Sequence, residues 1–454
     1  MKDTLLVSAG DAVGASAPVS ALMQDEPTLN ILNKLHFDVG TLGNHEFDHG
    51  VNEMLRQIYG GKNPTTHKNF NGLDFPYVCA NVISEKTKKP LLPPYVIKKV
   101  HGVNIGFIGV DTTETPSITM PNNVKGIQFT DEAKAINKYA KVLKKKGIKT
   151  IIVLAHDPGT SNQDGSNANG KVIDIAKKVD PEVDVIFGGH NHAYLNTKVN
   201  GKLVVQAYSY GTAFSDVRLW IDPKTKDVIT DNADIITTYQ DAIKPDPQIK
   251  KMIDADEAKV APLINQKLGT AAAALTGQQN ASGESNLGDF ITDAQRDATG
   301  AQIAITNPGG IRADINSGTI TWGDLYTVQP FNNTLVTMNL TGSQLRTILN
   351  EQWSDKTDPK MLQIPGMKYT WDSTKDGDKV VSLTLADGTP IENDKSYTVT
   401  VNSFLSTGGD GFLELAKGAN FVNGMIDLDA LVNYVKKQTS PISVSTGDRI
   451  KKIN

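Results

Sequence analysis

The sequence predicts an α/β protein with two domains, and three observations lead to this prediction. Its 454 residues exceed the roughly 250–300 that a single hydrophobic core can serve. In the first half, short apolar runs alternate with helical patterns, which is typical of a layered α/β domain. Residues 241–247 then break this pattern with two prolines and lead into a polar helix. We therefore expect a first domain over residues 1–240, a linker helix over 241–268 and a second domain over 269–454.

The first domain contains apolar, β-branched runs that have the pattern of buried strands. These runs cover residues 5–7, 105–110, 151–154, 183–187 and 203–205. Three of the five have Asp111, His156 or Gly188 within two residues of their end, as expected where the carboxyl ends of strands carry chemistry. A helix is predicted from 131 to 146, with Thr130 as its N-cap and Gly147 as its stop.

The second domain is predicted to mix one clear helix with several strands. Ser285 can cap a helix whose apolar positions recur between residues 287 and 298, and Gly300 ends it. Strand-like runs follow at residues 302–306, 335–340, 380–385 and 397–401.

Composition excludes several classes of function. The net charge of −4 argues against a general nucleic-acid-binding surface, which needs a basic face. A small anionic substrate is still allowed, because a bound metal supplies positive charge that composition does not count. The single cysteine excludes an internal disulfide. No apolar run approaches the roughly 18 residues of a membrane span.

Four short motifs in the first domain place metal-ligating residue types after predicted strands or short apolar segments. They are Ser8-Ala9-Gly10-Asp11, Gly43-Asn44-His45-Glu46-Phe47-Asp48, Ala155-His156-Asp157 and Gly188-Gly189-His190-Asn191-His192. Strand ends along one edge of an α/β sheet converge in space. Each motif alone could be an ordinary turn, but an ordered set of four is hard to obtain by chance. Imidazole with carboxylate favours Zn, Mn or Fe over Mg or Ca.

The second domain carries a further set of motifs with glycine, arginine and aromatic residues. Asn307-Pro308-Gly309-Gly310-Ile311-Arg312 follows a strand-like run, and Phe331 and Asn333 lie in the next loop. Phe404 precedes the turn Gly408-Gly409-Asp410-Gly411. Glycines beside an arginine let a phosphate reach backbone N–H groups and a guanidinium, and two phenylalanines can sandwich a planar base. Singly, the phenylalanines fit core positions and Arg312 a surface charge.

The four motifs of the first domain resemble the metallophosphoesterase pattern, a four-layer β-sandwich flanked by helices. The resemblance implies two divalent metal ions, with Zn or Mn expected. Asp11 would bridge them, Asn44, His156 and His190 would bind one, and His192 the other. His45 would contact the phosphate as a catalytic residue, and Asp48 would orient and polarise it.

Together with the first domain, the second resembles the C-terminal domain of the 5′-nucleotidase family. This implies a second α/β domain that binds the nucleotide. Phe331 and Phe404 would stack on the base and Asn333 would bind its edge. Asn307 and Asp410 would bind the ribose. Arg312 would bind the phosphate, with Gly309, Gly310 and Gly409 lining the pocket.

Three departures from the family pattern bear on function. The Asp-x-His motif would precede residue 1, so we expect a chain that lacks its true beginning and any export signal. One metal position would then keep only Asp11 and His192. Pro308 replaces the first glycine of Asn-Gly-Gly-Gly and removes an N–H from the phosphate loop. Residues 276–282 lack the arginines often found there, which favours monophosphates or cyclic monophosphates over di- and triphosphates.

The resemblance predicts hydrolysis of nucleoside 5′-monophosphates and/or 2′,3′-cyclic nucleotides. The expected partner is a small nucleotide rather than a nucleic-acid polymer, with no membrane span and a monomeric or dimeric state. The family implies an extracellular, cell-surface or periplasmic location. Two alternatives stay open, namely a non-catalytic nucleotide- or metal-binding surface protein, and a UDP-sugar or other phosphodiester hydrolase on the same scaffold.

Overall fold

The computed structural model describes residues 3–355 and 359–454, which divide into two compact units. Unit 1 comprises residues 1–14 and 19–256, and unit 2 comprises residues 15–18 and 257–454. The predicted linker includes α7 (Pro247–Ile264), which contains Pro262, and the next strand, β16 (Lys267–Ala271), follows it. Among the described residues, no helix is both long and apolar enough to cross a membrane.

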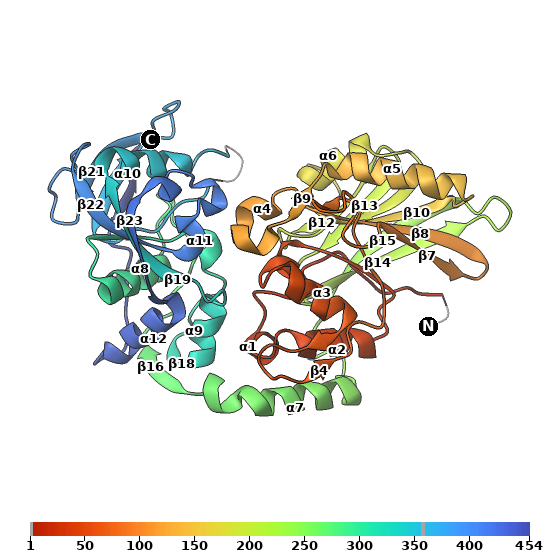
Figure 1. The fold of residues 1–454 in the computed structure, drawn as a ribbon, viewed down its shortest axis with the longest axis horizontal. Helices are drawn as coiled ribbons and strands as arrows, with labels where there is room; N and C mark the ends of the chain where they lie inside the picture. The colour runs from red at the N-terminus through yellow and green to blue at the C-terminus, as the bar shows by residue number, and fades with distance from the viewer. Residues whose placement is uncertain (1–2, 356–358) are drawn as a thin grey trace. The chain divides into compact units, whose positions relative to one another are not determined.

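Unit 1 is built around a six-stranded sheet (Figure 1), with strand order β12-β13-β11-β10-β8-β7. The four central strands are parallel, and the edge strands β7 and β12 are antiparallel to their neighbours. The strands are β7 (Tyr95–Val100), β8 (Val103–Asp111), β10 (Thr150–His156), β11 (Val183–Phe187), β12 (Tyr194–Val199) and β13 (Lys202–Ala207). The apolar runs that predicted the four central strands are confirmed, although the strand bounds differ by up to two residues.

Both faces of this sheet are buried, which explains its apolar strands. One face packs against α5 (Glu132–Lys145) and α6 (Lys171–Lys178), through Ile136 and Ile173 among others. The other face packs against a second layer of strands, through Phe107 and Leu154 among others. That layer contains the parallel sheet β1 (Val7–Ser8), β2 (Val39–Thr41) and β5 (Tyr77–Val78), and the ribbon β14 (Ala213–Ile221) and β15 (Val228–Thr237).

A fourth layer, formed by helices, covers the far side of β2 and β5. There Met54 and Ile58 of α3 (Val51–Tyr59) pack with Tyr77 and Phe47. The helix α2 (Glu26–Lys34) adds Leu29 and Leu32 to a neighbouring small cluster. Unit 1 is thus the expected four-layer arrangement of helices, two layers of strands and helices. The short elements of unit 1 are β3 (Gly61–Lys62), β4 (Asn69–Phe70), β6 (Val82–Ser84), α4 (Thr115–Ile118) and β9 (Ile127–Phe129). The short helix α1 (Pro18–Ala21) begins at the last residue of the segment 15–18 and continues into unit 1.

The N-cap predicted for α5 is one residue too early. The cap is Asp131, whose carboxylate accepts a hydrogen bond from the Lys134 N–H at 2.7 Å. Thr130 instead donates its hydroxyl to the Asn81 carbonyl at 3.0 Å. A second good capping residue next to the predicted one therefore took the role, because the Thr130 hydroxyl has a tertiary partner.

Unit 2 contains a four-stranded sheet of order β17-β22-β19-β23 and a three-stranded sheet of order β21-β20-β24. The helix predicted after Ser285 is confirmed as α8 (Asn286–Thr299), with Ser285 accepting from the Gly288 N–H and Gly300 in the left-handed region. The strands are β17 (Ile303–Ile305), β18 (Gly318–Thr321), β19 (Thr334–Thr341), β20 (Met367–Trp371), β21 (Val380–Leu385), β22 (Ser396–Asn402), β23 (Ala419–Ile426) and β24 (Ile450–Lys452). The other helices are α9 (Trp322–Val328), α10 (Gly342–Glu351), α11 (Ser403–Ser406) and α12 (Asp427–Lys437).

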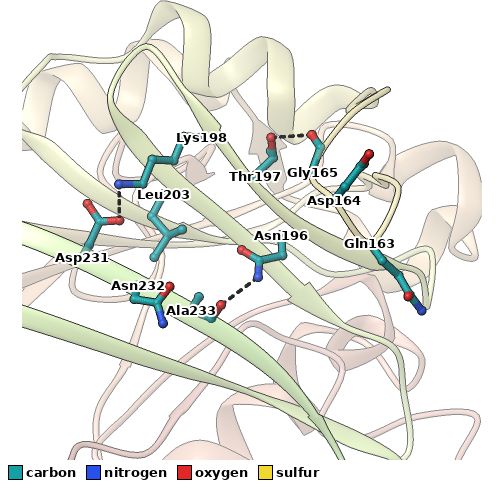
Figure 2. A pocket seen from close by; sticks show the side chains of 10 residues that line it. All are labelled: Gln163, Asp164, Gly165, Asn196, Thr197, Lys198, Leu203, Asp231, Asn232 and Ala233. Carbon is teal, nitrogen blue, oxygen red and sulfur yellow. Dashed lines mark hydrogen bonds and ion pairs between the residues drawn. The ribbon is translucent and has the colours of Figure 1, made fainter.

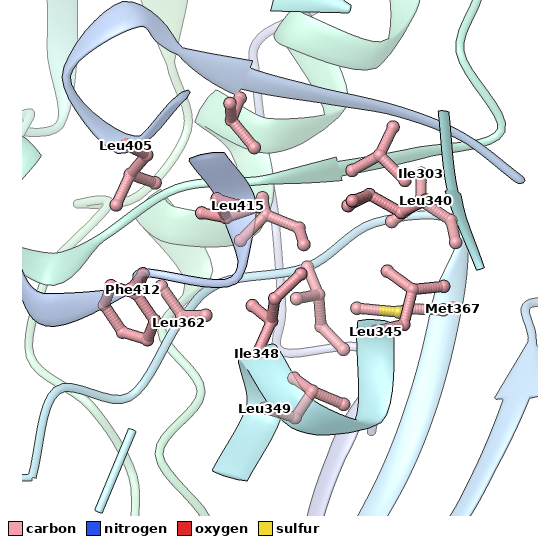
Figure 3. Close-up of a cluster of buried hydrophobic side chains, with 14 of the residues drawn as sticks. Ile303, Leu340, Leu345, Ile348, Leu349, Leu362, Met367, Leu405, Phe412 and Leu415 are labelled. Carbon is pink, nitrogen blue, oxygen red and sulfur yellow. The ribbon is translucent and has the colours of Figure 1, made fainter. Parts of the chain in front are cut away.

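The core of unit 2 lies around α10 and the strands that face it. Leu345, Ile348 and Leu349 of α10 point toward Leu340 and Met367 (Figure 3), and all five are buried. Leu405 and Phe412 extend the same cluster. They flank the turn that carries Asp410, so packed apolar side chains support the candidate binding residues of this unit.

A buried carboxyl pair ties the end of the chain to α8. Glu284 and Asp289 are each 1% exposed and both accept from the Gly447 N–H, at 3.1 and 3.3 Å. Burial raises the pKa of Asp289 to about 7; Arg449 opposes this increase and the nearby Glu284 adds to it. The folded protein therefore holds a proton here that the unfolded chain loses near pH 4, which stabilises the folded state at low pH.

We expect stability to fall as pH rises from about 4 to about 7 because of this pair, and Asp289→Asn to flatten that dependence. Asparagine mimics the protonated carboxyl without titrating, so the two slopes should differ by about 1 kcal/mol per pH unit. Denaturant unfolding at pH 5, 6, 7 and 8 measures it, with the exposed Asp376→Asn as control. An unchanged slope in Asp289→Asn would show that the pKa of Asp289 is not raised in the folded protein.

Candidate metal centre and nucleoside pocket

The predicted metal ligands of unit 1 follow strand ends and converge. Asp11 follows β1, Asn44 follows β2, and His156 is the last residue of β10. Asp11 Oδ2 lies 2.9 Å from His156 Nε2, and Asn44 Oδ1 lies 2.9 Å from His190 Nδ1. The His156 and His190 rings meet edge to face at 5.3 Å between centroids. These four side chains therefore share one position at the carboxyl edge of the strands.

Backbone contacts fix how these side chains point. His156 Nδ1 donates to the Ala9 carbonyl at 2.8 Å, which fixes the orientation of the ring with Nε2 facing Asp11. The other oxygen of Asp11 accepts from the His45 N–H at 3.0 Å. A side chain at Gly43 would collide with Asp11 Oδ1, so glycine is required there. The centre is thus shaped by backbone as much as by its ligands.

Asp11 and His156 form a tightly coupled pair of opposite charges. Burial opposes ionisation of Asp11, but the positive charge of His156 holds the pKa of Asp11 well below its usual range. Burial would likewise lower the pKa of His156, and Asp11 overcomes it and raises the value to about 10. His190 is half-buried and close to that positive charge, and this partial desolvation and the positive charge lower its pKa to about 3. A neutral imidazole, as at His190, is the form that binds metal.

The donor set fits a divalent transition metal. The ligand atoms of Asp11, His156 and His190 all lie within 4.8 Å of one another, and Asn44 adds an amide oxygen beside His190. One carboxylate with two imidazoles is a combination that zinc and manganese accept. His192 is not in this group of three; its ring packs edge to face on Tyr210 at 5.4 Å.

His45 and Asp48 lie next to this centre as an oriented pair. His45 Nδ1 is 2.8 Å from Asp48 Oδ2, and the two side chains are 14% and 19% exposed. His45 lies in the short helical turn Asn44–Phe47, and Asp48 is the C-cap residue of that turn. A carboxylate on one ring nitrogen fixes the orientation of the imidazole.

Sequence reasoning missed the part that Glu46 plays in this centre. Its buried carboxylate accepts from the Asp11 N–H at 2.9 Å, the Ala12 N–H at 2.9 Å and the Gly43 N–H at 2.6 Å. Burial, with Asp11 nearby, raises the pKa of Glu46 to about 7, although these backbone donors oppose the change. Glu46 thereby joins the loop of Asp11 to the turn of Asn44. The signal was present in Gly43-Asn44-His45-Glu46, but the partners Asp11 and Ala12 are more than thirty residues away.

The predicted nucleoside-binding residues of unit 2 come together from three segments. Asn307 donates its amide to Asp410 Oδ2 at 2.6 Å and accepts from Asn402 Nδ2 at 3.1 Å. Ser403 donates to Asn333 Oδ1 at 3.0 Å, so the loop of Phe331 and Asn333 adjoins the segment of Phe404. A Cβ on Gly409 would come within 2.5 Å of the Phe404 ring, which explains the glycine.

Arg312 lies beside Phe331, and a proline-containing turn directly follows Asn307. The Arg312 guanidinium lies 5.9 Å from the Phe331 ring centroid, and its buried Nε has no hydrogen-bond partner among the described residues. Pro308 begins a short 3-10 helix over Pro308–Gly310 with Gly309 inside it. Proline is well accommodated at a first helical position, where its missing N–H would have had no helical partner.

Comparison with known proteins identifies both halves. Residues 1–194 match the calcineurin-like phosphoesterase model, and residues 266–417 match the model of the 5′-nucleotidase C-terminal domain. The chain belongs to the 5′-nucleotidase family. The solved 5′-nucleotidase precursor from Thermus thermophilus superimposes on 100% of this chain and 90% of its own, with a TM-score of 0.85 and 29% identity.

Curated relatives of this 5′-nucleotidase-family chain are longer than it is. Endonuclease YhcR of Bacillus subtilis is 44% identical over 99% of this chain, which covers 37% of that protein. Cell wall protein Lmo0130 of Listeria monocytogenes is 38% identical over 98% of this chain, which covers 62% of that protein. The chain thus spans less than two thirds of the length of either relative.

A polar pocket elsewhere in unit 1 includes none of the predicted site residues. Its lining comes from residues 163–165, from β12 and β13, and from β15 (Figure 2). Lys198 pairs with Asp231 at 2.8 Å, Asn196 donates to the Ala233 carbonyl at 2.8 Å, and Thr197 donates to the Gly165 carbonyl at 2.9 Å. These groups of the pocket wall form hydrogen bonds and an ion pair with one another, and we assign the pocket no ligand.

Proposed function

We propose that the chain is a metal-dependent phosphohydrolase that acts on nucleoside 5′-monophosphates and 2′,3′-cyclic nucleotides. The observation that carries the proposal is the convergence of Asp11, Asn44, His156 and His190 beside the His45–Asp48 pair. Metal ligands next to an oriented imidazole suit phosphate ester hydrolysis. The family models that match both halves support the same reaction class.

In this proposal Asp11, Asn44, His156, His190 and His192 hold two divalent ions, zinc or manganese. When bound, such ions activate water and neutralise the charge of the phosphate. His45 contacts a phosphate oxygen through Nε2 and stabilises the charge that develops as the ester bond breaks. Asp48 holds the His45 ring, which lies 2.8 Å away, in the orientation that this contact needs.

The nucleoside part of the substrate would be bound by unit 2. Phe331 and Phe404 stack on the base and Asn333 binds its edge, while Asn307 and Asp410 bind the ribose. The unpaired Nε of Arg312 supports a role in phosphate binding, because a buried guanidinium nitrogen without a partner among the described residues is costly unless a ligand supplies one. Gly309, Gly310 and Gly409 keep the pocket open.

We expect the metal-loaded chain to hydrolyse AMP and 2′,3′-cyclic AMP with a kcat/KM at least about tenfold above that for ADP and ATP, since residues 276–282 supply no cation for extra phosphates. A substrate panel with Mn²⁺ or Zn²⁺, measured by phosphate release, tests this. The matched control is the chelated protein, which should be inactive and recover when metal returns.

Other results of the same panel decide between the alternatives. A clear preference for ATP contradicts the expected selectivity. Nucleotide binding by a chain with about two bound metals but without turnover favours a non-catalytic surface protein. Turnover confined to UDP-glucose favours a sugar-nucleotide hydrolase. An RNA oligonucleotide belongs in the panel because one relative is described as an endonuclease.

We also propose that the chain acts outside the cytoplasm, at the cell surface or in the extracellular or periplasmic space. The support is a relative described as a cell wall protein, with 38% identity over 98% of this chain. Immunodetection in fractionated producing cells tests the location, and recovery with the cytosolic fraction alone contradicts it. We further expect a monomer or dimer, which sedimentation can decide.

A further inference from the structure

Lys360 places a positive charge at the ribose-binding position that is expected around Asp410. Its Nζ lies 3.6 Å from Asp410 Oδ1, while Asp410 Oδ2 accepts from Asn307 at 2.6 Å. The Lys360 side chain is 34% exposed and that of Asp410 is 12% exposed. Asp410 therefore stands between an amide that holds it and a cation that reaches it from a loop outside every motif of the sequence.

The backbone around Lys360 is fixed to the strand end that carries Asn307. The Thr306 N–H donates to the Gln363 carbonyl at 3.1 Å, and the Gln363 N–H donates back at 2.9 Å. Buried Gln352 accepts from the Lys360 N–H at 2.9 Å through its carbonyl, and from the Leu362 N–H at 2.7 Å through its side chain. The position of Lys360 beside Asp410 is therefore determined by the fold of this segment.

The geometry leaves donors of Lys360 available to a ligand. A separation of 3.6 Å gives an ion pair but is longer than a hydrogen bond. Among the described residues, Asp410 is the one ionic partner found for Lys360. The half-exposed ammonium group has three N–H donors, which can therefore form hydrogen bonds with an incoming anion.

The charge has a consequence for the kind of nucleotide that fits. A carboxylate alone suits a free ribose diol, because it accepts hydrogen bonds from both hydroxyls. A phosphate ester on the 2′ or 3′ oxygen brings a second negative charge next to the carboxylate, which is unfavourable. A lysine beside the carboxylate offsets that repulsion and can donate to the phosphate oxygens.

We propose that Lys360 is a specificity-determining residue for nucleotides that carry a phosphate on the ribose 2′ or 3′ oxygen, either as a 3′-monophosphate or as a 2′,3′-cyclic phosphate. The inference rests on the proposed function, in which Asp410 binds the ribose. It adds to that function a preference at the ribose edge, carried by one side chain.

The test is equilibrium binding of adenosine, AMP, 3′-AMP and 2′,3′-cyclic AMP to the full chain in EDTA, by calorimetry. Lys360→Met keeps the length of the side chain and removes its charge. We expect binding of 3′-AMP and 2′,3′-cyclic AMP to weaken about tenfold, as for loss of one charged hydrogen bond. Adenosine and AMP should change less than about twofold, which is within the usual effect of a surface substitution.

Controls separate this inference from the proposed function. Lys368→Met removes an exposed lysine of β20 and should leave all four affinities unchanged, and Lys360→Arg should retain 3′-AMP binding. Equal weakening of all ligands, or no weakening, in Lys360→Met would overturn the role of Lys360 while leaving the pocket intact. Failure of the wild type to bind adenosine would overturn the pocket itself, and this inference with it.

Discussion

Replacing His45 by alanine is expected to lower kcat by about 10²–10⁴-fold while the metal content of the chain stays unchanged. His45 is not in the cluster of Asp11, His156 and His190. Its Nδ1 lies 2.8 Å from Asp48 Oδ2. On the proposed mechanism, its loss removes the group that contacts the reacting phosphate and leaves the proposed metal ligands in place. Phosphate release and metal analysis on the same preparation measure the two effects.

Two companion variants sharpen the His45 result. Asp48→Asn should lower kcat by a smaller factor, and the double variant should be no slower than His45→Ala, because Asp48 acts through His45. The exposed neighbour His49 is the matched control, since His49→Ala should keep wild-type kcat. A His45→Ala chain that loses metal would assign His45 to the ligand set, and one with wild-type kcat would remove it from the mechanism.

Replacing Glu46 by glutamine is expected to weaken metal binding by about 10–100-fold, the usual cost of removing a group that orients metal ligands. The Glu46 carboxylate accepts three backbone N–H groups, from Asp11, Ala12 and Gly43. A glutamine has one oxygen and turns an NH2 group toward at least one of these donors. Competition with a chelator of known affinity measures the change in dissociation constant.

The stability of the metal-free protein distinguishes positioning from simple unfolding. Glu46→Gln should remain folded, with a thermal transition close to that of the wild type when metal is saturating. The exposed Glu85→Gln is the matched control and should keep wild-type affinity. An unchanged dissociation constant in Glu46→Gln would mean that the loop of Asp11 holds its shape without the carboxylate.

The convergence of the candidate metal ligands was predictable because these side chains follow the ends of parallel strands. His156 ends β10, and His190 follows β11, so strand order alone brings them to one edge. The sequence motif included Glu46, but the hydrogen-bond partners of Glu46 could not be predicted. They are backbone N–H groups, which nearly every residue has. A sequence pattern identifies candidate side chains, but it does not predict which backbone N–H group will donate to a given carboxylate.

Lys360 and the ribbon of β14 and β15 show two other features that the sequence did not predict. Lys360 lies in an irregular loop, and tertiary hydrogen bonds of that loop to Gln352 and Thr306 bring it to Asp410. In β14, Val217, Leu219 and Ile221 alternate with outward residues, which is a readable strand signal. Charges at Asp216 and Arg218 interrupted the continuous apolar run on which the prediction depended.

Three residues of the predicted ligand set lie in left-handed backbone. Asp11, His190 and His192 have φ values of 53°, 79° and 54°. Aspartate and histidine tolerate this region better than most residues, so turn chemistry and coordination chemistry select the same amino acids here. A designer who grafted these side chains onto another α/β sheet would therefore also have to copy the loops. Libraries that vary these positions should be restricted to Asp, Asn, His and Gly.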